Sequence, residues 1–262
     1  MKLLTFLSDF GTKSSYISQM KGIALSMTDT FIVDISHEIS PHNIREGAFV
    51  LMTSVAYFPM GTVHVAVVDP GVGTLRRGIV ITTKTQILVG PDNGLLIPAA
   101  RNLGDFTVYE ITNPKLSSNF VSDTFHGRDV FTPVAAHILN GLLFEQIGPI
   151  IKDFINLDFG NFEINNKRAI GKVIYIDRFG NIITNINGFA LKHVLSFDKK
   201  ITLFIGRKKF VIPYVKSYNF VKPGKLLATM GSSNYLEIAL NQADAAKKLG
   251  LKPDDDIKVL FS

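Results

Sequence analysis

Short apolar runs alternate with polar and glycine-rich segments along the first half of the chain. Residues 3–7 and 63–68 are almost continuously apolar and β-forming, which is typical of strands buried on both faces of a parallel sheet. Apolar side chains at helical spacing predict helices over 16–27 and after Asn43 and Glu46, which have the spacing of a capping pair. Further strands are predicted at 31–35, 78–83, 86–90 and 106–111, and further helices at 95–102 and 132–141. This alternation predicts an α/β fold.

The pattern changes beyond residue 147. Residues 148–168 are rich in Gly, Pro, Asn and charged side chains without periodicity, which indicates a linker. The rest of the chain contains one predicted helix, which ends at Gly250, and several strands separated by turns. These strands are predicted at 172–177, 181–186, 201–206, 209–214, 225–231, 235–240 and 256–261. We therefore expect an N-terminal α/β domain, residues 1–160, and a smaller C-terminal β-barrel domain, residues 161–262.

Two of the predicted buried strands end in an aspartate, Asp9 and Asp69. Open α/β sheets bind their ligands at the carboxyl ends of the strands, so a shared cleft is expected there. The glycines after Asp69 allow a sharp turn and close approach of a ligand, and Arg76 adds fixed positive charge. A plain turn with a solvated aspartate and two surface arginines, Arg76 and Arg77, explains this stretch equally well.

Four histidine and aspartate positions have more than one interpretation. His126 lies in FHGRDVF, where a loop enters a predicted helix, and backbone N–H groups at such an entry favour anions. Asp92 lies in PDNG, which indicates a turn more strongly than a place in a cleft. His37 and His42 precede a predicted helix and are more typical of surface or loop-packing histidines than of ligands.

Composition narrows the class of protein. Hydrophobic residues make up 46% of the 262 residues and charged residues 19%, so a folded core is expected. The net charge of +6 comes from scattered Lys and Arg without a nucleic-acid motif, and we expect no nucleic-acid partner. No apolar run is long enough to span a membrane and Asp9 comes too early for a secretion signal, which indicates a cytoplasmic protein. The lack of cysteine excludes disulfides and thiolate chemistry, and without HExxH or GxSxG neither a metal site nor a serine hydrolase is predicted.

Five motifs, taken in order, resemble the S-adenosyl-L-methionine (SAM) hydroxide adenosyltransferases, also called SAM hydrolases, which are related to fluorinase and chlorinase. The motifs are SDFGT (8–12), VVDPGVGTLRR (67–77), FHGRDVFTPVAA (125–136), IDRFGNIITNI (176–186) and GSSNYLEIALNQADAAKKLGL (231–251). They span nearly the whole chain, and together they are far more specific than any one of them. The resemblance implies a three-layer α/β/α domain followed by a β-barrel, in a homotrimer whose active sites lie between the N-terminal domain of one subunit and the C-terminal domain of its neighbour.

The resemblance also implies roles for particular residues. Asp69, Arg76 and His126 stand where the family activates water, whereas the halogenating relatives have Tyr and Gly at the first and last of these positions, so hydroxide is the expected nucleophile. Arg77 is expected at the surface. The implied substrate-binding residues are Asp9 at the ribose hydroxyls, and Asp177, Phe179, Asn181, Ser232, Ser233, Tyr235, Glu237 and Ala239 around adenine and methionine. Leu240 departs from the halogenases, which have Arg there, so the partner of the methionine carboxylate is left open.

The implied reaction is hydrolysis of SAM to adenosine and L-methionine by attack at ribose C5′, with SAM as substrate and no further cofactor. Methionine leaves as a neutral thioether, so only the water requires help, typically worth about 10²–10⁴-fold. Neutralisation of the sulfonium by incoming hydroxide is favoured in a dry pocket. Two alternatives are a protein that binds SAM or adenosine without turnover and a halide-using adenosyltransferase. A metal-dependent phosphohydrolase using Asp9, Asp69, Asp92 and His126 rests only on acids at strand ends.

Overall fold

The computed structural model describes residues 2–261, and the chain divides into two compact units, one ending at Asp158 and the other beginning at Phe159. No helix within the described residues is long and apolar enough to cross a membrane. The strands of the first unit are β1 (Leu3–Ser8), β2 (Phe31–Ser36), β3 (Val63–Val67), β4 (Gly78–Thr83), β5 (Ile87–Pro91), β6 (Phe106–Glu110) and β7 (Ile150–Ile151). Its helices are α1 (Tyr16–Met27), α2 (Ile44–Val55), α3 (Ile97–Leu103) and α4 (Thr132–Leu139), with short 3-10 turns at Pro114–Leu116 and Phe144–Gln146 and a π-turn at Gly127–Phe131.

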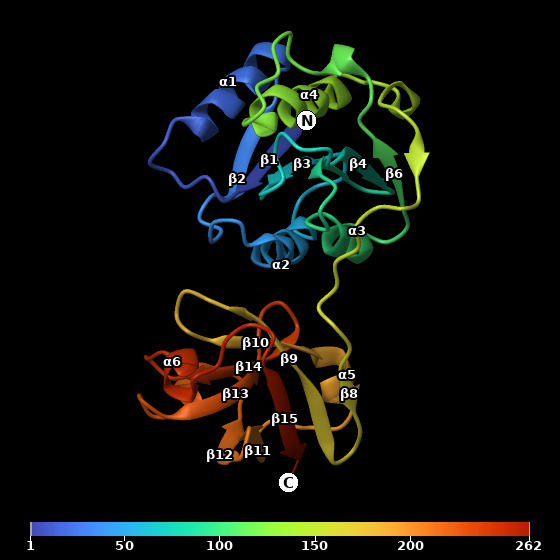
Figure 1. Ribbon diagram of the computed structural model, residues 1–262. Helices are drawn as coiled ribbons and strands as arrows, with labels where there is room; N and C mark the ends of the chain where they lie inside the picture. Colours follow the sequence, from blue (N-terminus) through green and yellow to red (C-terminus); the bar gives the residue numbers. More distant parts are fainter. Residues whose placement is uncertain (1, 262) are drawn as a thin grey trace. The chain divides into compact units, whose positions relative to one another are not determined.

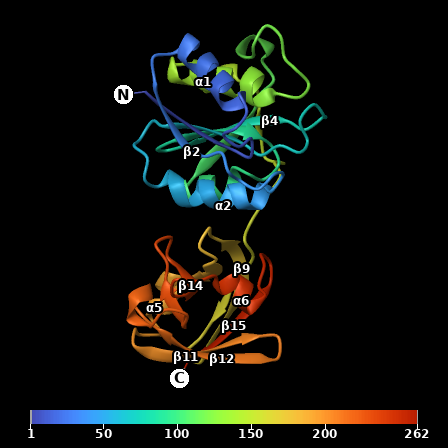
Figure 2. The same ribbon diagram turned by 90° about the vertical axis from the view of Figure 1, so that its left-hand side faces the viewer.

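The N-terminal unit is a seven-stranded sheet between two layers of helices. The strand order is β2-β1-β3-β5-β4-β6-β7, and β2, β1, β3 and β5 run parallel, whereas β4 is antiparallel to both of its neighbours. Helices α1 and α4 pack together on one face of the sheet, and α2 and α3 pack together on the other (Figures 1 and 2). The expected α/β/α layering is confirmed.

The start of α2 shows how the local sequence sets an element boundary. Asn43 Oδ1 accepts the Glu46 N–H at 3.1 Å, and the Glu46 carboxylate accepts bonds from Asn43 Nδ2 and from the Ser40 N–H. The first bond satisfies a helix-terminal donor that would otherwise lack a partner, and the other two hold the Glu46 side chain at the start of the helix. The capping pair expected from the sequence is confirmed.

The C-terminal unit is a closed β-barrel. Its strands are β8 (Glu163–Ile164), β9 (Arg168–Ile176), β10 (Ile182–Asn187), β11 (Lys199–Ile205), β12 (Lys208–Tyr214), β13 (Leu226–Met230), β14 (Tyr235–Leu240) and β15 (Asp256–Phe261), with helices α5 (Gly188–Lys192) and α6 (Ala245–Leu249) and a 3-10 turn at Tyr218–Phe220. The order β10-β14-β13-β12-β11-β15-β9 closes through pairing of β9 with β10. All seven strands expected in this part of the chain are therefore present, and their inward side chains form one apolar core.

A buried polar network links strands β1 and β3 to Gln86, the residue before β5. His64 on β3 is fully buried, its Nδ1 is 2.7 Å from Thr5 Oγ1 and its Nε2 is 3.1 Å from Gln86 Oε1. The Gln86 amide nitrogen donates to the Val55 and Phe58 carbonyls, so its oxygen must accept from His64 Nε2. His64 is therefore a neutral ring with its proton on Nε2, and burial lowers its pKa to about 4.

This network predicts a stability that depends on pH. The unfolded chain binds a proton at His64 below pH 6.5 while the folded chain resists it down to about pH 4, so the free energy of unfolding falls as the pH drops through that window. The full difference corresponds to about 3 kcal/mol. Urea unfolding between pH 7.5 and 4 measures it. His64→Leu should be less stable at pH 7.5 and lose less stability on acidification; equal pH slopes in both proteins would contradict the assignment.

Candidate active site

Asp9 and Asp69 lie at the same edge of the N-terminal sheet. Strands β1 and β3 are parallel neighbours, and Ser8 is paired with Val67. Each aspartate follows its strand directly or after one residue, so both come from the carboxyl ends of adjacent strands. Open α/β sheets bind their ligands at this edge.

Arg76 holds Asp69 through a forked set of hydrogen bonds. Its Nε is 3.1 and 2.9 Å from the two carboxylate oxygens, and its Nη2 is 2.5 Å from Oδ2. The side chains are only 12% and 4% exposed, so both charges are largely withdrawn from water and held in one geometry. The Arg76 guanidinium also lies 5.1 Å from the centre of the Phe131 ring.

His126 is joined to the same guanidinium. Arg76 Nη2 is 2.8 Å from His126 Nδ1, and because a guanidinium only donates, Nδ1 must be the acceptor. Burial and the positive charge of Arg76 lower the pKa of His126, while the nearby aspartates, Asp69 among them, oppose this only in part. At neutral pH the ring is therefore uncharged and carries its proton on Nε2, which faces away from Arg76.

A glycine allows the loops that carry these residues to meet. Gly73 has φ +75°, and a Cβ there would lie 2.3 Å from the Asp123 carbonyl oxygen. Any side chain at this position would push apart the loop that bears Arg76 and the segment that leads to His126. His126 itself precedes the π-turn at residues 127–131, which continues into α4. The expected loop-to-helix junction is therefore present, but its first turn is a π-turn, which is wider than an α-helical turn.

Asp9 is oriented by the loop that precedes α2. Its Oδ2 accepts the His42 N–H at 2.8 Å, and Oδ1 receives no hydrogen bond from any residue of the described part of the chain. His42 has φ +66° and is exposed, while His37 is buried in the same loop. One oxygen of Asp9 is thus fixed by the backbone and the other is open to a ligand.

Arg77 and Asp92 have a structural role that the sequence did not predict. Arg77 binds Asp92 Oδ2 at 2.7 Å and Asp153 Oδ1 at 3.0 Å, and its side chain is only 25% exposed. Asp92 is buried and its Oδ1 also accepts the Ile155 N–H. Arg77 is thus partly exposed, and in addition it fastens part of the expected linker to the N-terminal unit.

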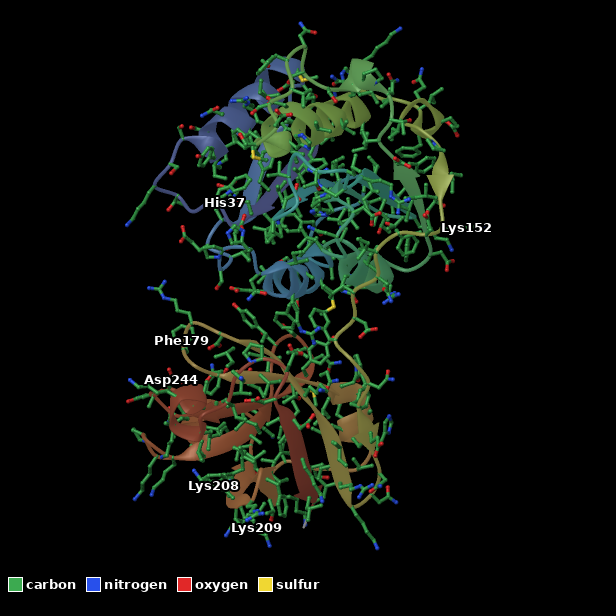
Figure 3. The ribbon with its side chains drawn as sticks, viewed as in Figure 1. His37, Lys152, Phe179, Lys208, Lys209 and Asp244 are labelled. Carbon is green, nitrogen blue, oxygen red and sulfur yellow. The ribbon has the colours of Figure 1, made fainter. Side chains whose placement is uncertain are left out.

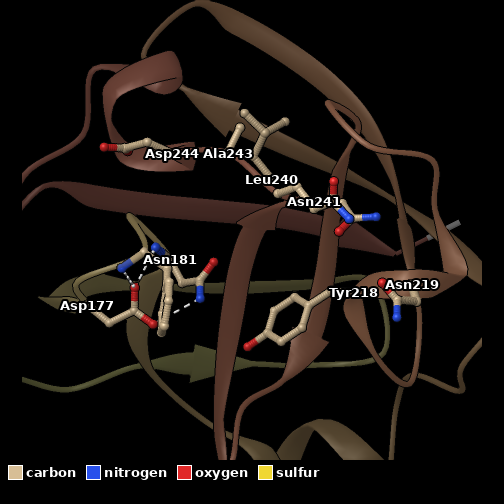
Figure 4. A pocket seen from close by; sticks show the side chains of 10 residues that line it. Asp177, Asn181, Tyr218, Asn219, Leu240, Asn241, Ala243 and Asp244 are labelled. Carbon is tan, nitrogen blue, oxygen red and sulfur yellow. Dashed lines mark hydrogen bonds between the residues drawn. The ribbon is translucent and has the colours of Figure 1, made fainter.

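The C-terminal unit contains a hollow of about 620 Å³ that includes three of the expected substrate residues (Figure 4). It is lined by Asp177, Phe179, Asn181, Tyr218, Asn219, Leu240, Asn241, Gln242, Ala243 and Asp244. Asp177 accepts the Phe179 and Asn181 N–H groups and a bond from Asn181 Nδ2 at 2.9 Å. Asp177 is therefore occupied in shaping the turn, whereas the Phe179 ring is 75% exposed and remains available for stacking (Figure 3).

Close packing across this turn again requires glycine. Gly180 has φ +79°, and a Cβ there would lie 2.3 Å from the carboxyl carbon of Asp244. The Asn181 amide has one donor bonded to Asp177 and keeps its oxygen and second N–H without a partner among the described residues. An amide presenting a donor and an acceptor side by side matches the pattern on the edge of adenine.

The other expected substrate residues lie outside the wall of this hollow. Ser232 and Ser233 form the turn between β13 and β14, and Tyr235 begins β14, where burial raises its pKa. Ala239 is fully buried and packs with the apolar side chains of Val215 and Leu227. The structure therefore brings only Asp177, Phe179 and Asn181 of this set directly to the hollow.

Glu237 reaches the hollow through a residue that the sequence analysis missed. Tyr218 O–H donates to Glu237 Oε1 at 2.7 Å, and Tyr218 lines the hollow. Burial, followed by the Glu237 carboxylate, raises the pKa of Tyr218, and burial raises the pKa of Glu237. Tyr218 lies in a short 3-10 turn between strands, without periodicity or a charged neighbour to mark it.

The expected site residues therefore form two groups in different units, Asp9 with the bonded set Asp69, Arg76 and His126 in the first and the hollow in the second. Within residues 2–261, no group of three or more His, Cys, Asp or Glu side chains is arranged to hold a metal ion.

Comparison with known proteins agrees with these motifs. The model of the SAM hydroxide adenosyltransferase N-terminal domain matches residues 4–148, and that of the C-terminal domain matches residues 171–258. A protein of Methanocaldococcus jannaschii named (R)-S-adenosyl-L-methionine hydrolase is 39% identical over 100% of this chain and 97% of its own length. One of the same name from Salinispora arenicola is 34% identical over 98% and 97%.

More distant relatives and a solved structure fit the same pattern. The fluorinase of Nocardia brasiliensis is 27% identical over 98% of this chain and 96% of its own. The crystal structure of an uncharacterised conserved protein from Thermotoga maritima, 39% identical, superposes with a TM-score of 0.92 over 98% of this chain and 99% of that one. With both domain models matched and full-length relatives above 30% identity, the chain belongs to the SAM hydroxide adenosyltransferase family.

Proposed function

We propose that this protein hydrolyses SAM to adenosine and L-methionine. The observation that carries the proposal is the bonded set Asp69, Arg76 and His126 beside the carboxyl end of β3, in a chain that is 39% and 34% identical to two proteins named (R)-SAM hydrolase. Asp9 supports it as an acceptor open to the ribose hydroxyls, and Phe179 and Asn181 as partners for adenine.

In this proposal Arg76 holds Asp69 and His126 in place, and these two residues act on the water molecule. His126 Nε2–H donates a hydrogen bond to the water oxygen. This orients the water so that one lone pair of its oxygen points toward C5′. As the O–C5′ bond forms, the C5′–S bond breaks and its electron pair stays on sulfur, so the sulfonium charge disappears. The attacking oxygen becomes strongly acidic, and Asp69 accepts its proton and passes it to solvent. The reaction in this form requires no cofactor, because a neutral thioether leaves unaided.

Conversion of SAM by the purified protein, resolved by liquid chromatography, tests this function. We expect adenosine and methionine in equal amounts, with or without added chloride or fluoride. Because the relatives are named for the (R) compound, both sulfonium epimers should be supplied separately. A halogenated nucleoside would indicate a halide-using enzyme instead, and tight SAM binding without any product would indicate a binding protein.

Variants of the bonded set should lose chemistry and keep binding. Asp69→Asn and His126→Ala are expected to lower turnover by about 10²–10⁴-fold, because both act on the water and carry few substrate contacts. SAM affinity, measured by calorimetry, should change only a few-fold. Asp105→Asn and His193→Ala, at exposed positions, serve as matched controls with wild-type turnover.

Asp9→Ala should show the opposite balance, with weakened binding, since it removes an acceptor for the ribose. If Asp69→Asn and His126→Ala kept wild-type turnover while Asp9→Ala alone abolished it, the water-activating assignment would be wrong.

We further propose a homotrimer with each active site shared by the N-terminal unit of one subunit and the C-terminal unit of its neighbour. The separation of the two groups of site residues between units supports this. So do exposed apolar side chains near both: Leu75 and Phe120 in the loops before Arg76 and His126, and Phe179 and Phe220 beside the hollow. A cytoplasmic location also belongs to the proposal, is supported by the lack of cysteine, and can be tested by cell fractionation.

Co-expression of two inactive variants tests the shared site. His126→Ala damages only the N-terminal part and Phe179→Ala only the C-terminal part. In randomly mixed oligomers, about one interface in four combines two undamaged parts, so about a quarter of wild-type turnover should return. Mixed oligomers that stay as inactive as the separate variants would show that each site is built from a single chain.

A further inference from the structure

A second buried histidine, His37, lies directly behind the loop that carries Asp9. Its side chain is 3% exposed, and its Nδ1 is 2.8 Å from Ser8 Oγ at the fully buried end of β1. Its Nε2 faces Asp34 Oδ1 at 3.2 Å, and Asp34 Oδ2 binds Lys21 Nζ at 2.6 Å. These four side chains form a polar row that leads from the partly exposed Lys21 and Asp34 to the base of the Asp9 loop.

His37 has a charged neighbour, Asp34, on one side and a hydroxyl partner, Ser8, on the other. Burial would raise the pKa of Asp34, but the hydrogen bond from Lys21 and the proximity of the His37 ring outweigh it, so the carboxylate is ionised at neutral pH. At the other end, the hydrogen bond between His37 Nδ1 and Ser8 Oγ, 2.8 Å long, joins the ring to the start of the Asp9 loop. Ser8 Oγ also accepts the Phe10 N–H, at 3.3 Å.

These bonds enclose Asp9 on both sides. Ser8 and Phe10 are its chain neighbours, and Ser8 Oγ bridges them. The His37 carbonyl accepts the Gly11 N–H at 2.8 Å, and the same loop supplies the His42 N–H that binds Asp9 Oδ2. The backbone around Asp9 is therefore held by His37 through its ring and through its carbonyl, and the open oxygen Oδ1 inherits its direction from these contacts.

We propose that His37, held between Asp34 and Ser8, is a positioning residue that aims the free Oδ1 of Asp9 at the ribose diol of the substrate. The inference rests on the proposed function, which assigns Asp9 to the ribose. The proposed role is to orient the Asp9 loop. Replacing both the buried hydroxyl and the imidazole by apolar groups would cost little stability, but apolar groups form no directional bond that could hold the loop.

The fold supplies a matched control for the test. Thr5 Oγ1 and His64 Nδ1, 2.7 Å apart, make the same kind of buried bond from the same strand, three residues before Ser8. His37→Leu and His64→Leu each remove one such bond, so both should lower the free energy of unfolding measured in urea. His37→Asn retains a polar group where Nδ1 lies and guards against failure of His37→Leu to fold.

The measurement is calorimetric binding of adenosine and of 2′,3′-dideoxyadenosine to each full-length protein. We expect His37→Leu to bind adenosine about 10–100-fold more weakly, as for loss of one aligned charged hydrogen bond. His37→Asn should recover most of that loss, and His64→Leu should match wild type. For the dideoxy compound, wild type and His37→Leu should have equal affinity, because the diol that Asp9 would bind is missing.

Three outcomes would overturn the inference: unchanged adenosine affinity in His37→Leu, an equal loss for both nucleosides, or an equal loss in His64→Leu. Absence of adenosine binding by the wild type would overturn it too, together with the assignment of Asp9. If only the proposed SAM hydrolysis were wrong, the result would differ from these outcomes. The wild type would then bind adenosine and distinguish it from the dideoxy compound, but would release no product from SAM.

Discussion

The Arg76 guanidinium has five N–H donors and no acceptor, and the arrangement of the N-terminal site depends on this donor-only character. Both of its partners accept hydrogen bonds from it, Asp69 through its carboxylate oxygens and His126 through an unprotonated Nδ1. A single charged group thereby sets the orientation of one partner and the tautomer of the other. Lysine would supply the charge but no planar fork, and the orientation of both partners would be lost.

The sheet explains why residues so far apart in the chain meet around that guanidinium. Parallel strands β1 and β3 deliver Asp9 and Asp69 to one edge, and the loops after them are free to carry charge without disturbing the core. The remaining requirement is close contact between loops, which Gly73 permits at a point where a side chain would strike the backbone. Rigid strands thus fix the direction of the site, and glycines fix how tightly its loops close.

Much of this arrangement was predictable from the sequence. Apolar runs, turn residues and the Asn43 cap depend on local preferences, which is why the barrel strands and the start of α2 were found where expected. Tyr218 and the pairing of Arg77 with Asp92 were not, because each depends on a partner brought close only by tertiary folding. The antiparallel orientation of β4 was not predicted for the same reason, because an apolar run in the sequence does not show which way its strand runs in the sheet. The spacing of residues alone left the roles of Asp69, Arg76 and His126 open, and the resemblance of the motifs to a known family indicated those roles.

Two histidines on the N-terminal sheet show that the same bond can serve different ends. His64 lies on β3 within the sheet, bonded to Thr5 on β1 and to Gln86 just before β5, so its bonds add to the cohesion of this part of the sheet. His37 meets its serine at the last residue of β1, directly before the Asp9 loop. We therefore expect the His64 bond to affect how stable the fold is and the His37 bond to affect where the Asp9 loop points. On this view the position of a buried polar pair along a strand, and not its chemistry, decides whether a binding site depends on it.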